Sequence, residues 1–85
     1  APLQADVRFE FPTSLWVDRN GYGRMVEARA GGAVVRRFEV RQADPFLRWL
    51  QSLAGDAVVT GPPELREAQV DMARATLARY GEGHG

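Results

Sequence analysis

Arginine is the residue type in this chain with the clearest capacity for chemistry. All 11 basic residues of the 85 are arginine, and 11 acidic residues balance them, so the net charge is zero. The planar guanidinium suits bidentate contacts with carboxylate or phosphate, although biased codon usage explains the absence of lysine more simply. Because the global charge favours no anionic partner, any such role must come from a local arrangement of arginines.

The adjacent residues Arg36 and Arg37 form the most distinctive local group. The alternation of Val34, Phe38 and Val40 predicts an inward face, and by the same alternation Arg36 would point inward. Two interpretations stay open: a β-bulge or sheet-edge position that lets Arg36 reach solvent, or a pair directed at an anionic ligand held between this domain and a neighbour. The candidate contacts for an effector or a nucleic acid are Arg8, Arg36 and Arg37.

Catalytic residues are hard to find in the chain. The single histidine, His84, is next to the last residue, where a side chain is seldom held firmly enough to act as a base or a ligand. There is no cysteine, and no HExxH, GxxxxGK or GxSxG motif occurs. The sequence therefore predicts no catalytic residue, no metal site and no cofactor.

Periodicity and chain breaks predict the elements that would position these residues. Alternation bounded by Gly or Pro favours strands at 5–11, 24–30, 33–41 and 57–60. Helical spacing favours helices at 13–19, 45–54 and 64–80. This β-α-β-β-α-β order with an additional C-terminal helix predicts an α+β, ferredoxin-like domain with a four-stranded antiparallel sheet, helices on one face and the other face open.

The predicted strands fix the directions of their side chains. Val7, Phe9 and Phe11 would face inward until Pro12 ends the strand, and Gly31-Gly32 would supply the positive φ angles of a two-residue hairpin turn. The outward face would carry Arg8, Glu10, Glu27, Arg29, Arg37 and Glu39. Balanced charges of this kind favour cross-strand ion pairs over a phosphate-binding surface, and no aromatic residue joins them as a stacking platform for RNA.

The short helix at 13–19 is expected to turn Leu15 and Trp16 towards the core and to stop at Asn20-Gly21. An asparagine beside Arg19 could also belong to a phosphate cradle like that of small phosphatases that share the ferredoxin-like fold. The Asn-Gly dipeptide is more typical of a turn or a helix end.

The helix at 45–54 would begin after Asp44 as its N-cap, with Pro45 as its first residue. Its inward face would consist of Phe46, Trp49, Leu50 and Leu53.

The helix at 64–80 carries more apolar surface than its own sheet requires. Two neighbouring stripes cover more than half of its circumference. They are Val70, Ala73, Leu77 and Tyr80 in one stripe and Leu65, Ala68, Met72 and Ala75 in the other. Either the excess is buried against an adjoining domain or a second copy of the chain, or the alanines are neutral at the surface. The interface candidates are Leu65, Val70, Met72, Leu77 and Tyr80.

The order and spacing of these elements resemble a known family of domains. The stretch LRWLQSLAGDAVVTGPPELREAQVDMARATLARYG, residues 47–81, has an apolar helix ending at Gly, a short V-V strand, a proline, and P-E-L-R opening a helix that finishes near A-x-x-Y-G. With VRFEF at the start and a glycine-turned hairpin, it resembles the C-terminal extension (WCX) domain that follows the WYL domain in bacterial transcriptional regulators. The resemblance divides the chain into a linker at 1–4, a domain at 5–81 and a flexible tail at 82–85.

The resemblance implies a non-catalytic regulatory domain. Regulators of this family place a helix-turn-helix domain and a WYL barrel first, and the WYL and WCX domains are associated with dimerisation and with sensing a ligand, which in some members is single-stranded DNA. The expected partners are therefore those two N-terminal domains, a second copy of the chain and a nucleic-acid effector. The absence of cysteine and of a long apolar stretch favours the cytoplasm and no membrane segment. The start of the chain reads like the middle of a longer protein. A small phosphatase-like enzyme on the same fold and a stand-alone protein-interaction adaptor stay open as alternatives.

Overall fold

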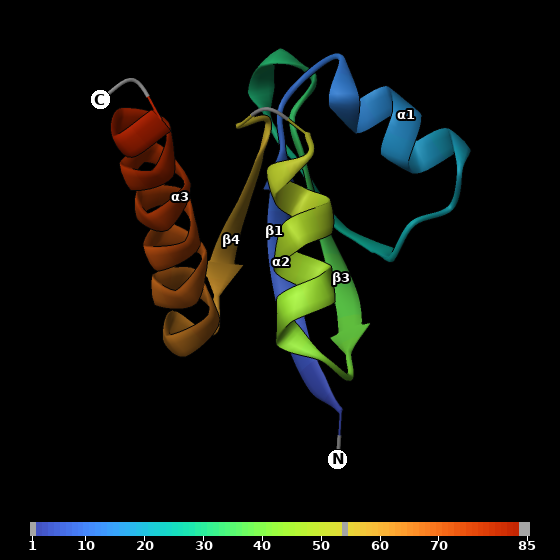
Figure 1. The fold of residues 1–85 in the computed structure, drawn as a ribbon. Coiled ribbons are helices and arrows are strands. Elements are labelled where there is room, and N and C mark those ends of the chain that lie inside the picture. Colours follow the sequence, from blue (N-terminus) through green and yellow to red (C-terminus); the bar gives the residue numbers. More distant parts are fainter. Residues whose placement is uncertain (1, 54, 84–85) are drawn as a thin grey trace.

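The structure of the chain is a computed structural model that describes residues 2–53 and 55–83, with side chains up to residue 79. These residues form a four-stranded antiparallel sheet and three α-helices in the predicted α+β, ferredoxin-like order with a C-terminal helix (Figure 1). The strands are β1 (Leu3–Phe9), β2 (Arg24–Ala28), β3 (Val34–Val40) and β4 (Ala57–Gly61), and the helices are α1 (Thr13–Arg19), α2 (Ala43–Gln51) and α3 (Pro63–Gly83). The sheet order β2-β3-β1-β4 places β1 and β3 in the centre and leaves β2 and β4 at the edges.

The strand β1 lies at the centre of the core because its side chains alternate. Ala5, Val7 and Phe9 are fully buried on the face that the helices cover, whereas Asp6 and Arg8 lie on the open face. The buried cluster is completed by Val17, Val40, Leu47, Leu50, Ala57, Val59 and Leu65. Every other element except β2 contributes to this cluster, so a single small core holds the sheet to its helices.

The prediction that Phe11 faces the core was wrong. β1 ends at Phe9, and the Glu10 carbonyl accepts a hydrogen bond from the Ser14 N–H at 2.9 Å, so the chain leaves the sheet before Phe11. Phe11 is 56% exposed, and its ring lies so close to Gly32 that a Cβ there would come within 3.1 Å of it. Since Gly32 also has a φ of +81°, both space and backbone favour glycine at this position.

The connection between β2 and β3 is longer than the predicted two-residue turn. It comprises a short 3₁₀ turn, η1 (Ala30–Gly32), and is closed by a hydrogen bond of 2.7 Å from the Arg29 N–H to the Ala33 carbonyl. Gly31 has a φ of 75°, so the predicted positive φ angles of the glycines are confirmed.

The helix α1 has the predicted bounds but a different rotation. Ser14 and Val17 are buried, whereas Leu15 and Trp16 are exposed, so the prediction that the latter two face the core was wrong. The Ser14 hydroxyl donates a hydrogen bond to the Gly32 carbonyl at 2.6 Å. This bond fixes the rotation of a short helix and directs Val17 inward.

The helix α2 packs over the central strands (Figure 1). It begins at Ala43, and the predicted N-cap Asp44 lies instead in its first turn, 3.7 Å from Arg48. Leu47 and Leu50 are its buried residues. The predicted inward face omitted Leu47, which lines a cavity between α2 and α3. The other members of that face, Phe46, Trp49 and Leu53, are half-buried.

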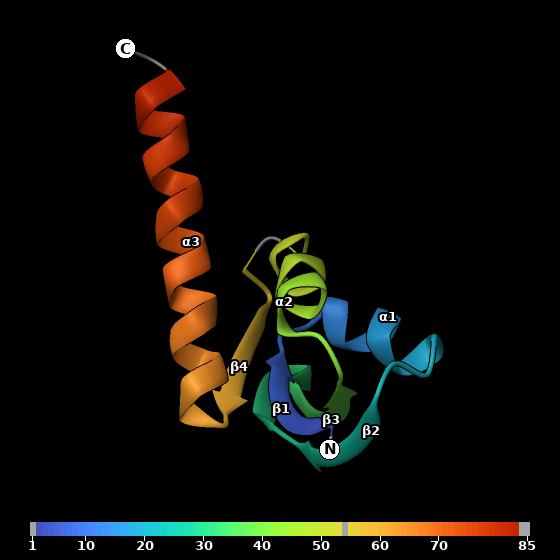
Figure 2. The ribbon, with the colours of Figure 1, turned by 60° about the horizontal axis from the view of Figure 1, so that its bottom comes forward.

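The helix α3 is the longest element and extends past the body of the domain. It is longer at both ends than the predicted 64–80, and its 21 residues span about 31 Å. Its first half packs beside β4, and the Gln51 amide of α2 donates a hydrogen bond of 2.6 Å to the Thr76 hydroxyl. Figure 2 shows the C-terminal end of α3 projecting beyond α2 and the sheet. His84 and Gly85, at the end of the predicted tail, lie outside the described residues.

Candidate functional site

One stripe of α3, the inner stripe, is used by the domain itself. It consists of Leu65, Ala68 and Met72: Leu65 is buried, and the other two are half-buried against the core. Leu65 and Met72, which were interface candidates, are therefore part of the internal packing of this chain.

The other stripe of α3, the outer stripe, is exposed, although two of its residues, Val70 and Ala73, also line a cavity with Leu47 and Leu50 of α2. It consists of Val70, Ala73 and Leu77, all of which are exposed. Val70 is 44% accessible and Leu77 is 71% accessible, the highest value among the large apolar residues described. The side chain of Tyr80, predicted in the same stripe, lies outside the described residues. Because a long helix gains most of its stability from an apolar face that is packed, an apolar stripe on the solvent side points to a contact with another surface.

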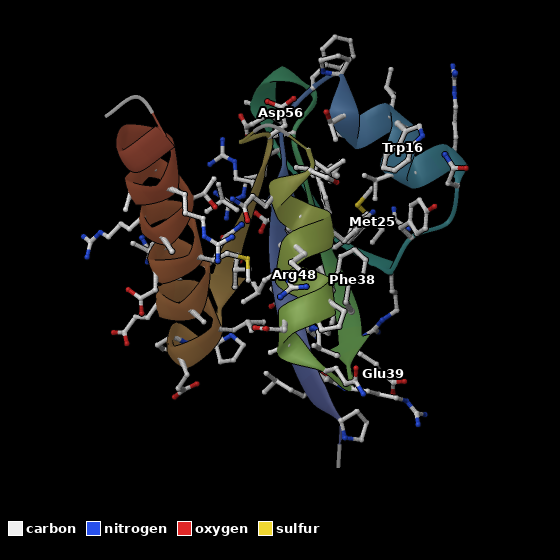
Figure 3. The ribbon with its side chains drawn as sticks, in the orientation of Figure 1. Trp16, Met25, Phe38, Glu39, Arg48 and Asp56 are labelled. Carbon is white, nitrogen blue, oxygen red and sulfur yellow. The ribbon has the colours of Figure 1, made fainter. Side chains whose placement is uncertain are left out.

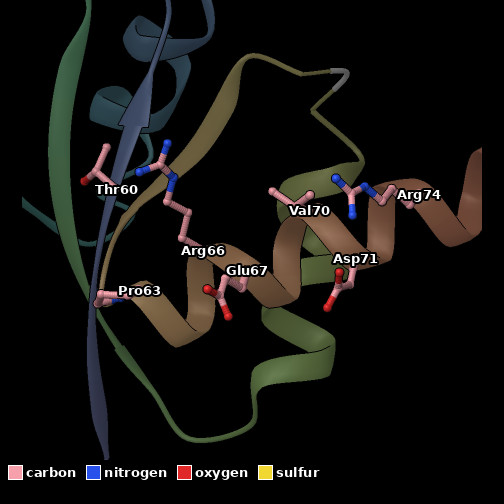
Figure 4. A pocket seen from close by; sticks show the side chains of 7 residues that line it. All are labelled: Thr60, Pro63, Arg66, Glu67, Val70, Asp71 and Arg74. Atoms are coloured by element: carbon pink, nitrogen blue, oxygen red, sulfur yellow. The ribbon is translucent and has the colours of Figure 1, made fainter.

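A groove of about 490 Å³ runs along the outer side of α3 where the helix passes β4 (Figure 4). Its walls are formed by Thr60, Pro63, Arg66, Glu67, Val70, Asp71 and Arg74. Figure 4 shows Arg66 and Arg74 extending on the same side of the helix as Val70, with Glu67 and Asp71 on the neighbouring side. Two arginines and two carboxylates balance, so the groove lacks the single sign of charge expected of a phosphate site.

The three candidate arginines do not converge. Arg36 is 5% exposed and lies on the helix side of the sheet, where its alternation predicted it. Its guanidinium donates to the carbonyls of Tyr22 at 2.5 Å and Gly23 at 3.0 Å, and to the Asp18 carboxylate at 3.1 Å. These bonds fix the loop between α1 and β2, so this side chain is committed to the fold of its own chain. The β-bulge that was one interpretation of Arg36 lies in the neighbouring strand β2, where the pairing with β3 shifts between Met25 and Glu27.

Arg8 and Arg37 lie on the open face of the sheet, and each has an acidic partner. Arg8 contacts Glu10 at 2.6 Å, and Arg37 contacts Asp6, its cross-strand neighbour, at 2.7 Å. The hydrogen bond from Arg37 lowers the pKa of the Asp6 carboxyl below its ordinary value of 3.8, against the opposing effect of burial. The prediction that the charged residues of this face pair across strands was wrong for Arg8–Glu10 and Arg29–Glu27, which pair two residues apart along the chain. Among the described residues, the ion pair that joins two strands is Asp6–Arg37, and Asp6 was not in the predicted set.

The structure bears on Asn20 and on the acidic side chains as candidate sites. The Asn20 amide donates to the Trp16 carbonyl at 2.8 Å and so closes α1, the role that its Asn-Gly dipeptide suggested. Residues 2–53 and 55–83 contain no group of three or more His, Cys, Asp or Glu side chains that could hold a metal ion. Within the same residues, no helix combines the length and apolarity needed to cross a bilayer.

An aromatic cluster between α1 and α2 was missed by the sequence analysis. Trp16 contacts Tyr22 with ring centroids 5.2 Å apart, Tyr22 contacts Trp49 at 5.1 Å, and Trp49 contacts Phe38 at 5.8 Å. Trp16 and Tyr22 remain about 40% exposed, and Figure 3 shows Trp16, Met25 and Phe38 along this side of the domain. The signal in the sequence was weak, because Tyr22 belongs to a loop whose position depends on the bonds from Arg36.

Fold and surfaces together define a ferredoxin-like α+β domain with an exposed stripe on its terminal helix. A family model described as the WCX domain matches residues 1–77, which include all four strands and the outer stripe. The chain belongs to the WCX domain family, and the resemblance found in the sequence is confirmed. A search of curated proteins and a search of solved structures found no match.

Proposed function

We propose that this chain is the non-catalytic C-terminal domain of a cytoplasmic WYL-type transcriptional regulator, and that it helps the regulator to self-associate through α3. The observation that carries the proposal is the outer stripe, in which Leu77 is 71% exposed on a helix that projects beyond its own sheet. Membership of the WCX family supports the regulatory context. The helix-turn-helix domain that reads DNA and the WYL domain would belong to the same chain.

The outer stripe suits an antiparallel contact between two copies of α3. Ala73 lies midway between Val70 and Leu77 along the stripe. A crossing at Ala73 would set Val70 of one helix against Leu77 of the other, and the small alanine side chain would let the axes approach closely. The contact is isologous, so it closes as a dimer.

The experiment compares Leu77→Asp with Ala78→Asp in the full-length regulator by light scattering. Both residues are exposed, but Ala78 lies about 100° around the helix from Leu77, away from the stripe. Leu77→Asp should raise the dimer dissociation constant by about tenfold or more, because it places an unpaired carboxylate in an apolar contact. Equal effects of the two substitutions, or no effect of either, would remove the outer stripe as the interface.

Effector sensing is the second part of the proposal and rests on the WCX family and on the open face of the sheet. Arg8 and Arg37 are the residues proposed to contact an anionic effector, such as single-stranded nucleic acid. Arg36 is left out because its guanidinium already serves three partners in the α1–β2 region.

A further inference from the structure

The two edge strands of the sheet, β4 and β2, differ in what lies beside their outer edges. Along β4, the Gln69 amide of α3 accepts a hydrogen bond from the Val59 N–H at 2.8 Å and donates one to the Ala57 carbonyl at 2.9 Å. Along β2, the described residues provide a strand partner only on the β3 side, and every residue of Arg24–Ala28 is exposed. An edge strand with unpaired N–H and C=O groups is a template for another strand.

The bulge in β2 gives this free edge a specific pattern. Arg24 is paired with Arg37 and Glu27 with Val35, and these two residues of β3 are two apart and so face the same side. Arg24 and Glu27 therefore share the open face of the sheet although they are three residues apart. In a regular strand that spacing would put them on opposite faces.

The sequence Arg24-Met25-Val26-Glu27 is complementary to itself when read antiparallel. A two-fold axis between Met25 and Val26 would set Arg24 of one copy opposite Glu27 of the other, twice, with Met25 opposite Val26 between the two charged pairs. Opposite charges and apolar pairs directly across a strand interface are both favourable. The central residues are also free to take part, since Met25 is 44% and Val26 is 43% exposed.

We infer that the free edge of β2 pairs with β2 of a second copy of this chain, which would join two four-stranded sheets into one of eight strands. The two-fold axis is perpendicular to the sheet, so both helix layers lie on one side and both open faces on the other. Met25 and the exposed Trp16 and Tyr22 of each copy would then lie beside the seam, the boundary between the two paired β2 strands, and would lose contact with water there.

This contact is separate from the proposed dimer through α3. The outer stripe belongs to the helix beside β4, at the opposite edge of the sheet from β2 (Figure 2). A chain that uses both surfaces assembles beyond the dimer, because each copy then has two partners. The protein with only one surface intact stops at the dimer.

The test is a charge reversal across the proposed seam, measured by analytical ultracentrifugation of the full-length protein at low salt. Arg24→Glu and Glu27→Arg are each made in the wild type and in the Leu77→Asp background, together with the double swap R24E/E27R. Each single reversal places like charges opposite each other twice and should weaken association by about tenfold, whereas the swap should restore it to within about threefold of the parent. Glu39→Arg, an exposed residue of the central strand β3 on the same face, is the matched control and should have no effect.

The outcomes separate the two surfaces. Wild-type protein should form species larger than a dimer, the β2 reversals and Leu77→Asp should each leave dimers, and their combination should leave monomers. If Leu77→Asp has no effect, the wild type is a dimer, the reversals leave monomers and the swap restores the dimer, then the α3 dimer fails and the β2 contact stands. If the reversals leave association unchanged, or if the swap does not rescue them, the β2 contact is overturned.

Discussion

The side chain of Gln69 takes the place of a neighbouring strand beside Val59. Its Oε1 accepts the Val59 N–H at 2.8 Å, and its Nε2 donates to the Ala57 carbonyl at 2.9 Å. The amide thus satisfies one donor and one acceptor of the edge strand β4, as a paired backbone would. Because α3 follows β4 directly in the chain, this contact also fixes the rotation of α3 that presents the outer stripe to solvent.

Substitution Gln69→Leu keeps the side-chain size roughly constant but removes both hydrogen bonds. We expect the free energy of unfolding to fall by about 1–2 kcal/mol, since the N–H of buried Val59 loses its partner. The Val59 amide should also exchange with solvent much faster in hydrogen-exchange measurements. The exposed Gln42, substituted in the same way, should change stability by less than about 0.5 kcal/mol. Unchanged exchange at Val59 would contradict a strand-like role for the amide.

The buried Arg36 predicts a structural phenotype and not a binding one. Arg36→Met should lower the free energy of unfolding by about 2 kcal/mol, because three hydrogen bonds of a charged donor are lost. Tyr22 should become more mobile, since its carbonyl is held by Arg36. The measurements are urea unfolding and the fluorescence of the contacting Trp16. Arg29→Met removes an exposed arginine whose pair with Glu27 is 3.4 Å long and should cost less than about 0.5 kcal/mol. Equal effects of the two substitutions would show that burial of Arg36 adds nothing.

The Asp6–Arg37 pair predicts an acid-dependent part of the stability. The folded-state pKa of Asp6 is lowered from 3.8, chiefly by the hydrogen bond from Arg37. Its contribution is therefore present above pH 3.8 and is lost as the pH falls through the lower folded-state pKa. Asp6→Asn should be less stable than the wild type near neutral pH, and the difference should shrink in strong acid. Urea unfolding at about pH 7 and about pH 2 measures this, and a difference that is constant with pH would contradict the pairing.

The order of the elements could be predicted because their patterns are local. Alternation in β1 and the apolar spacing of α3 need no information from the rest of the chain. The end of β1 could not be located from alternation, since Phe11 continues the pattern while the Glu10 carbonyl has already turned to Ser14. The rotation of α1 likewise depends on Gly32, which is distant in sequence and accepts a hydrogen bond from Ser14.

Among the surfaces, likewise, those that follow from local spacing could be predicted and those that depend on the folded chain could not. The outer stripe follows from helical spacing, so Val70 and Leu77 were named from the sequence. The partners of Arg36 are backbone carbonyls brought to it by the fold, and backbone positions leave no trace in side-chain periodicity. The bulge in β2 places Arg24 and Glu27 on one face of the sheet, whereas simple alternation puts them on opposite faces. The charge pattern along this edge could therefore be recognised only from the pairing register.

The open face of the sheet gives the prediction that tests effector sensing. Arg8 and Arg37 both point away from the helices, and removal of either leaves its acidic partner, Glu10 or Asp6, on the face. The variant R8A/R37A should therefore bind a single-stranded oligodeoxythymidine more weakly than the full-length wild type. Each arginine that contacts a phosphate releases counterions, so the slope of log affinity against log salt should decrease in magnitude by about 1 to 2. The matched control is Arg48→Ala, an exposed arginine of α2 that also has an acidic partner but lies on the other side of the domain. If R8A/R37A keeps the affinity and the salt slope of the wild type, the open face is excluded as the effector surface. If Arg48→Ala loses as much affinity as R8A/R37A, only the overall charge of the domain matters.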